Sequence, residues 1–253
     1  MAFRREGTLA SEFVRSAVFA ALVVGVGLIG CGDEQRIDPM TALLNEETAP
    51  LYTILQNQTD SPLVHFRLGE VYSKFDVRDS ARVCFERSIR LHDAFPDAHF
   101  QLAQIQYQDG DHEAALASYL QTVRFRSNDA KAYNNIGFIY KVTGRLDEAE
   151  ESYLKAIDTD STLVEAYNNL GQVYKQRKQF ERAVELMSAA VRVDAQMPES
   201  YVNLAMVHRS LEDEEREAEV LQRYIDRFGA DLPHSEYAAE RLAELATNPP
   251  TIE

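Results

Sequence analysis

The sequence AYNNIGFIYKVTG, at residues 132–144, returns thirty-four residues later as AYNNLGQVYKQRK, at residues 166–178. A repeat at a fixed interval of this length is typical of proteins built from stacked structural units. Five copies align without a gap, and we number them units 1 to 5. They span residues 62–95, 96–129, 130–163, 164–197 and 198–231.

Within each unit, apolar and small residues recur at helical spacing. Counting from 1 at the start of each unit, position 7 is always aliphatic, position 24 is large and apolar, and position 20 is alanine in the first four units. Position 7 comprises Leu68, Leu102, Ile136, Leu170 and Leu204. Positions 3, 7, 10 and 14, and then 20, 24 and 28, follow the spacing of amphipathic helices. Each unit is therefore predicted to form two helices that bury their apolar stripes by stacking on neighbouring units.

These units resemble the tetratricopeptide repeat (TPR), whose signature W-x2-L-G-x2-Y…A-x3-F recurs every 34 residues. The first half of that signature is matched by Leu68-Gly69 with Tyr72, Ile136-Gly137 with Tyr140, and Leu170-Gly171 with Tyr174. The resemblance covers residues 62–231 and implies an all-α superhelix of helix–turn–helix units, an α-solenoid. Unit 5 departs from the pattern because Glu217 replaces the alanine of position 20. Either its inter-helix turn is one residue longer, or it is a degenerate terminal unit.

Further helices are expected on both sides of the units. Residues 41–61 are predicted to form an N-terminal helical cap over the first unit. Residues 232–247 carry an amphipathic pattern and are predicted to form the C-terminal capping helix that keeps such an array soluble. An Asn-Pro-Pro sequence then ends regular structure, so residues 248–253 are predicted to be a disordered tail.

The N-terminal segment, residues 1–30, is predicted to be a secretory signal peptide. Three arginines precede an uncharged run of fifteen residues, Ser16 to Gly30, which is shorter than the roughly 18 residues that a membrane-spanning helix needs. The run ends in Leu-Ile-Gly-Cys at residues 28–31, which resembles the lipobox of bacterial lipoproteins. This resemblance implies cleavage before Cys31 and acylation of its thiol. The alternative is an uncleaved anchor with a coincidental cysteine.

The predicted lipid anchor implies a location at the bacterial cell envelope. Residues 31–40 would form a short polar tether between the lipidated Cys31 and the helices. Gly32, rather than an aspartate, follows the cysteine. The inner-membrane retention pattern of enterobacterial lipoproteins is therefore absent, which favours the outer membrane in a host with two membranes.

Composition and motifs exclude several other classes of function. The formal net charge of −15 argues against nucleic-acid binding, which needs a basic surface to neutralise phosphates. The sequence has no glycine-rich phosphate loop and no H-E-x-x-H, C-x-x-C or G-x-S-x-G motif. We therefore expect no catalytic residue, no metal and no cofactor, and the protein is predicted not to be an enzyme. His65 and His99, both at the ring position 4, are expected to be packing substitutes for tyrosine, and Cys84 a buried filler.

The TPR resemblance implies that positions 2, 5, 6, 9, 12 and 13 of the first helices line the inner groove of the superhelix. Asparagines recur there at position 6, beside cations at position 12. The predicted peptide-binding residues are Phe100, Asn135, Phe138, Lys141, Asn169, Lys175, Asn203 and Arg209. A primary amide both donates and accepts hydrogen bonds, so such a ladder can hold the backbone of an extended peptide. The alternative is that the asparagines bond only the neighbouring repeat. The cations predict a preference for acidic side chains in the peptide.

The sequence thus predicts a lipid-anchored TPR scaffold or adaptor that binds a protein or an extended peptide through its concave groove. Envelope lipoproteins of this architecture include pilotin-type proteins of type IV pilus assembly and adaptors that recruit cell-wall hydrolases, and the sequence does not choose between them. A further alternative is a structural component that forms homo-oligomers through its terminal units. The membrane is expected to be reached through the lipid anchor, and no nucleic-acid partner is expected.

Overall fold

The computed structural model describes residues 39–57, 60–229, 232 and 234–247. The predicted signal peptide, Cys31, most of the tether and the predicted tail lie outside the described residues. The chain divides into Met1–Leu43 and Leu44–Glu253, and the packing described below is within the second part. None of the helices that the structure describes is both long enough and apolar enough to cross a membrane.

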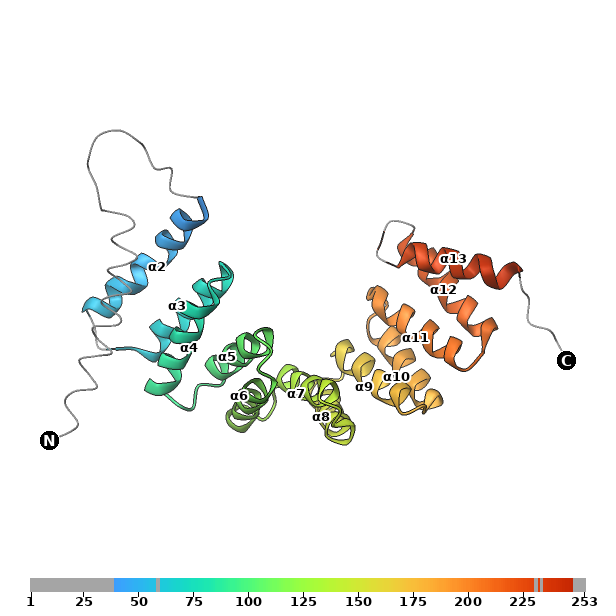
Figure 1. The fold of residues 1–253 in the computed structure, drawn as a ribbon, viewed down its shortest axis with the longest axis horizontal. Helices are drawn as coiled ribbons and strands as arrows, with labels where there is room; N and C mark the ends of the chain where they lie inside the picture. The colour runs from blue at the N-terminus through green and yellow to red at the C-terminus, as the bar shows by residue number, and fades with distance from the viewer. Residues whose placement is uncertain (1–38, 58–59, 230–231, 233, 248–253) are drawn as a thin grey trace. The chain divides into compact units, whose positions relative to one another are not determined.

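The described residues form twelve α-helices and no β-strand, which confirms the all-α fold (Figure 1). α2 (Pro39–Asn57) comes first, so this helix begins inside the predicted tether and ends before the predicted boundary at residue 61. The five units supply the helix pairs α3 (Pro62–Lys74) and α4 (Arg78–Leu91), α5 (Pro96–Gln108) and α6 (His112–Phe125), α7 (Ala130–Val142) and α8 (Leu146–Thr159), α9 (Val164–Gln176) and α10 (Phe180–Val193), and α11 (Pro198–Ser210) and α12 (Glu214–Phe228). The last helix is α13 (Ser235–Thr247).

The two helices of a unit approach closely because position 8 is small where position 24 is large. A Cβ atom added to Gly137 would lie 2.8 Å from the ring of Tyr153, and one added to Gly69 would lie 2.5 Å from the ring of Phe85. The alanine at position 20, such as Ala149, is fully buried beside this contact. The predicted stripes at positions 7 and 24 are buried in all five units, so each unit is a closely fitted helix pair.

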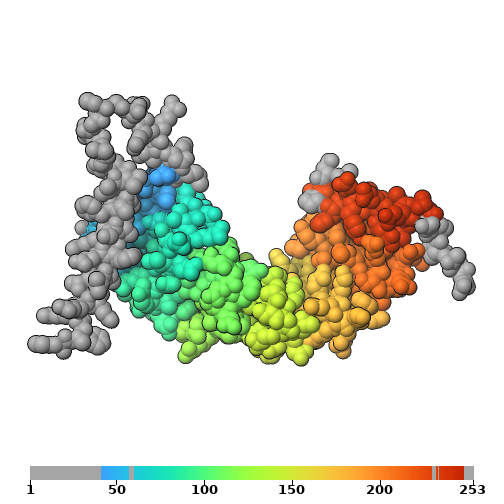
Figure 2. All heavy atoms as spheres, in the orientation of Figure 1, coloured from blue at the N-terminus to red at the C-terminus, as the bar shows by residue number. Residues whose placement is uncertain are grey.

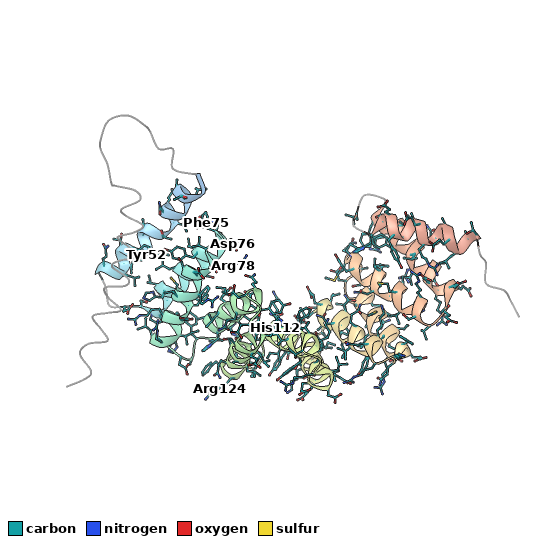
Figure 3. The ribbon with its side chains drawn as sticks, viewed as in Figure 1. Tyr52, Phe75, Asp76, Arg78, His112 and Arg124 are labelled. Atoms are coloured by element: carbon teal, nitrogen blue, oxygen red, sulfur yellow. The ribbon has the colours of Figure 1, made fainter. Side chains whose placement is uncertain are left out.

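The turn between the two helices uses a left-handed residue in every unit. The residues at position 15 are Asp76, Gly110, Gly144, Lys178 and Glu212, with φ angles of 56°, 82°, 80°, 60° and 58°. The two glycines are the residues for which this conformation is easy. In unit 1, Arg78 Nε donates a hydrogen bond of 2.9 Å to Asp76 Oδ1 across the turn (Figure 3). The backbone geometry of the repeat is therefore kept even where the sequence lacks its preferred glycine.

Consecutive units stack in chain order. Each second helix packs against the first helix of the following unit, from α4 on α5 to α10 on α11, and Figure 2 shows the units as successive colour bands. The first helices α7, α9 and α11 also contact one another directly, α7 with α9 and α9 with α11. We call the surface formed by positions 6, 9, 12 and 13 of these first helices the first-helix face. It is the counterpart of the predicted inner groove.

The C-terminal end explains the departure of unit 5. α12 begins at unit position 17, as the other second helices do, so the turn before it is not longer. Glu217 is fully buried at position 20, and its carboxylate accepts two hydrogen bonds from the Arg241 guanidinium on α13, at 2.9 and 3.0 Å. Where the other units have an alanine, unit 5 therefore has a carboxylate that is paired with the helix that follows it.

Candidate peptide-binding face

The asparagines at position 6 each bond to the preceding unit. Asn169 donates from Nδ2 to Asn134 Oδ1 at 3.1 Å and accepts from Lys141 Nζ at 3.2 Å. Its amide is thereby used on both sides to hold α9 against α7. Asn135 is hydrogen-bonded to the hydroxyl of Tyr119 in unit 2, whose pKa burial raises to about 12.

Asn203 is held differently from Asn169. Its Oδ1 accepts a hydrogen bond of 3.0 Å from Nε2 of Gln172, which joins α9 to α11. Its amide NH2 group has no partner among the residues that the structure describes. Of the two roles considered for the asparagines, bonding to the neighbouring repeat is thus what the structure shows, and Asn203 keeps donors for an external acceptor.

Lys141 is the most constrained of the three predicted cations. Its ammonium lies 4.7 Å from the ring centroid of Phe138 and donates to Asn169. Burial lowers the pKa of Lys141, since removal from water disfavours the charged form. On the other side, Phe138 meets the Tyr107 ring edge-on, with centroids 5.7 Å apart. Lys141 is therefore part of a packed row of side chains, not a free cation.

The other two predicted cations, Lys175 and Arg209, are less constrained than Lys141. Lys175 is half-buried and Arg209 is exposed, and neither side chain has a hydrogen bond, ion pair or ring contact with any residue of the described ranges. Arg177, which directly follows α9, is by contrast paired with both Asp147 and Glu150. Two neighbouring units thus present uncommitted positive charge at position 12.

Position 5 corrects the predicted groove. Phe66, Asn168 and Val202, all at this position, are buried instead of facing outward. Asn168 donates a 2.8 Å hydrogen bond to Ser200 Oγ of unit 5, so position 5 lies in the contact with the following unit. Phe100 is at the same position, half-buried, with its ring edge-on to Tyr119 at 5.3 Å. It is a packing residue more than a surface for a ligand.

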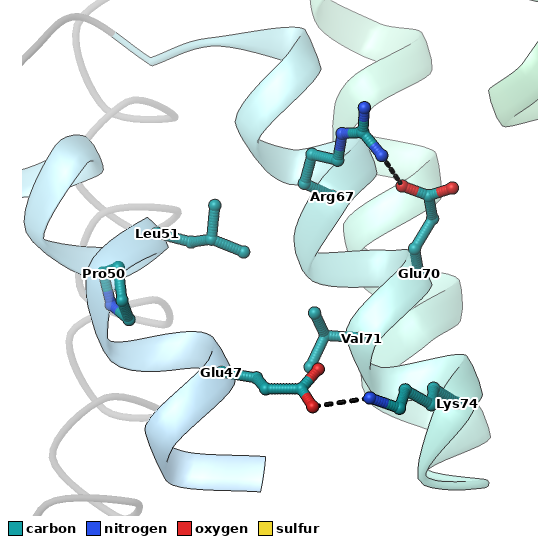
Figure 4. Close-up of a pocket in the computed structure, with 7 residues that line it drawn as sticks. All are labelled: Glu47, Pro50, Leu51, Arg67, Glu70, Val71 and Lys74. Atoms are coloured by element: carbon teal, nitrogen blue, oxygen red, sulfur yellow. Dashed lines mark hydrogen bonds and ion pairs between the residues drawn. The ribbon is translucent and has the colours of Figure 1, made fainter. Parts of the chain in front are cut away.

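The α2 end of the array has a separate opening. A pocket of about 490 Å³ lies between α2 and α3, lined by Glu47, Pro50, Leu51, Arg67, Glu70, Val71 and Lys74 (Figure 4). Lys74, at position 13, pairs with Glu47 of α2, and Arg67 pairs with Glu70. Arg67 and Lys74 of unit 1 are therefore already paired with carboxylates, unlike Lys175 and Arg209 of units 4 and 5.

The residues that join the first helices were only partly identified from the sequence. Gln172, Asn134 and Tyr107 take part in the contacts above but were not among the predicted site residues. Their unit positions could have identified them, because all three lie at positions 5, 9 and 12 of the first helices, which are positions of the predicted groove. Which partner each would find depends on the spacing between helices, and a single sequence does not contain that information.

The histidines and the cysteine are packing residues. His99 is buried and stacks on Phe125 with centroids 5.8 Å apart, while His65 is buried beside Asp60. Cys84 is buried, and burial raises the pKa of its thiol to about 12, which leaves it unreactive at neutral pH. Within the described residues, no three histidine, cysteine or carboxylate side chains come together as metal ligands.

Comparison with protein-family models settles the class of repeat. Models of the tetratricopeptide repeat match residues 128–196 and 168–232, and a model of the TPR repeat matches residues 105–144. Together they cover half of the chain, and the period, helix pairs and turns described above continue the pattern through unit 1. The chain is a tetratricopeptide-repeat protein.

Solved structures share this TPR fold at low sequence identity. The Pseudomonas aeruginosa PilF structure is 20% identical, covers 74% of this chain and 84% of its own length, and has a TM-score of 0.63. YrrB, a TPR protein with an unusual peptide-binding site, is 12% identical with 76% and 99% coverage and a TM-score of 0.62. MamA is 18% identical with 63% and 96% coverage and a TM-score of 0.57. No curated protein shows significant sequence similarity to this chain.

Proposed function

We propose that this TPR protein is a lipid-anchored scaffold or adaptor of the bacterial cell envelope that binds an extended segment of a partner protein on its first-helix face. The observation that carries the proposal is the linkage of α7, α9 and α11 by side-chain amides. A face that is ordered before binding limits the entropy lost on association. The unused donors of Asn203, Lys175 and Arg209 supply the polar contacts.

The exposed apolar residues of the face support binding rather than catalysis. Val142 on α7 and Met206 on α11 are 47% and 41% exposed, at unit positions 13 and 9 of first helices. The YrrB structure, with its peptide-binding site, shows that this fold accommodates a peptide in another chain.

The binding role is tested by a matched pair of variants in membranes. After crosslinking in cells, the tagged protein is purified and its partners are quantified by mass spectrometry. Val142→Asp with Met206→Asp should abolish recovery of the specific partner, because both changes place charge on the face. Leu120→Asp with Leu154→Asp, at 42% and 48% exposure on second helices, is the control for added charge and should retain it. Equal recovery from both double variants would exclude the first-helix face.

The anchor rests on the lipobox-like sequence before Cys31 and is tested separately. Wild-type protein should partition into the detergent phase and carry the mass of a chain that begins at an acylated Cys31. Cys31→Ser should be found in the aqueous phase. Wild-type protein of unprocessed mass that salt alone releases from membranes would refute the lipid anchor without affecting the binding proposal.

A role in type IV pilus assembly is the second candidate. It is favoured by the predicted lipoprotein signal together with the fold that the chain shares with PilF of Pseudomonas aeruginosa. Deletion of the gene in a piliated host should remove surface pili, and expression of the full chain should restore them. Normal pili in the deletion strain would rule this role out.

A further inference from the structure

We propose that α9 and α11 form a subsite for two carboxylates of one extended partner segment, with the carboxylates about three residues apart along the segment. The inference rests on the proposed function and specifies the chemistry of the partner. Its residues are Lys175, Asn203, Met206 and Arg209.

The charge of the subsite is opposite to that of the chain. The formal net charge is −15, and Lys141, the third cation of the first-helix face, already donates a hydrogen bond to Asn169. Lys175 and Arg209 keep their charge uncommitted to any described residue. A carboxylate from outside would therefore form a new ion pair without breaking one.

The spacing follows from how α9 and α11 are joined. The hydrogen bond of 3.0 Å from Gln172 to Asn203 holds the helices side by side, and Lys175 lies one turn beyond Gln172. Packed helices are separated by about 8–10 Å, and an extended chain advances about 3.3 Å per residue. A segment that crosses the two helices therefore meets the two cations with residues about three apart.

The neighbouring groups refine the pattern. The free NH2 of Asn203 can donate to a backbone carbonyl of the segment. Met206 is 41% exposed and lies three residues before Arg209 on the same helix, which favours an apolar side chain between the carboxylates. Lys141 is excluded as a third ligand because its ammonium already bonds Asn169 and covers Phe138; it is a positioning residue that keeps α9 in place.

The test uses the full chain in detergent micelles and fluorescein-labelled twelve-residue peptides built from serine, glycine and one central leucine. Each peptide carries two glutamates separated by one to six positions, and a control peptide carries two glutamines at a separation of three. Fluorescence anisotropy should give the tightest binding at a separation of three. Lys175→Gln with Arg209→Gln should weaken that binding about tenfold, the sum expected for two exposed ion pairs.

A second double variant controls for net charge. Arg192 and Arg227 are exposed on the second helices α10 and α12, and Arg192→Gln with Arg227→Gln removes the same two charges from another surface. This variant should bind the peptide as the wild type does. Absence of binding at every separation, equal affinity at all separations, or an equal loss in both double variants would overturn the subsite. Partner recovery that still depends on Val142 and Met206 would then leave the proposed function standing.

Discussion

The capping helix gives the sharpest test of the fold, because α13 is joined to unit 5 through a buried charge. The Glu217 carboxylate is 0% exposed and is satisfied by both arms of Arg241, whose side chain is 15% exposed. The hydrogen bonds that Arg241 donates to Glu217 raise the pKa of Arg241 further above its ordinary range. Arg241→Leu leaves a carboxylate buried without a partner, which typically destabilises by about 3–5 kcal/mol.

The loss should be local, since each unit of a solenoid contacts only its neighbours. We expect α13 to detach and the amides of α12 and α13 to exchange on the order of a hundredfold faster, while exchange in α5 to α8 stays unchanged. Hydrogen exchange measured by mass spectrometry resolves these segments. Circular dichroism during urea unfolding should show an early transition that wild type lacks.

The double variant Glu217→Ala with Arg241→Leu distinguishes a specific ion pair from simple loss of packing. It restores the alanine that the first four units carry at position 20, and replacement of a buried ion pair by apolar residues is often neutral. Exchange in α13 should therefore return to within about tenfold of wild type. If Arg241→Leu alone protects α13 as well as wild type does, Glu217 is not held in the buried state described here.

Gly137→Ala should destabilise unit 3 by about 1 kcal/mol in urea unfolding. The new Cβ atom would lie 2.8 Å from the fully buried Tyr153 ring, and the cost of this overpacking exceeds the gain in helix propensity. A higher urea midpoint than that of wild type would contradict this. Lys178→Gly should stabilise the folded protein by about 0.5–1 kcal/mol. Lys178 has a φ angle of 60°, and glycine relieves the strain of this left-handed conformation at some entropic cost. An unchanged or lower urea midpoint would show that the turn is not strained. Burial lowers the pKa of His208, so stability should fall as pH drops below the ordinary histidine value of about 6.5, where the unfolded chain takes up the proton first. His208→Gln should reduce the difference between midpoints at pH 7.5 and 5.5, and an identical difference would assign the effect to other groups.

The repeat and its helices could be predicted because the same physical constraint recurs at every unit. Position 7 must be aliphatic and position 20 small where the two helices of a unit meet, so five residues like Leu68 and four like Ala81 indicate the register without any tertiary information. Both positions are buried as expected. Gly110 and Gly144 have the left-handed φ angles of the turn, for which glycine is the favoured residue.

What the sequence left open depends on distances between helices. Glu217 breaks the pattern, but its partner Arg241 lies 24 residues away on another helix, and no spacing rule connects them. Lys141 and Lys175 have the same residue type at the same unit position. Of these two, only the Lys141 side chain has a hydrogen bond or ring contact with another residue that the structure describes. Its ammonium lies over the ring of Phe138, which packs in turn against Tyr107 of the preceding unit. The predicted ladder of equivalent cations is therefore reduced to two.

Binding of a partner protein on the first-helix face can be tested with a photo-activated crosslinking amino acid placed at Met206 or, as a control, at Leu154. These side chains are 41% and 48% exposed, on a first and a second helix respectively. After irradiation of cells that express the full chain, we expect a crosslinked partner from position 206 and none from position 154. Crosslinks to the partner from position 154 alone would show that the partner lies on the second helices instead.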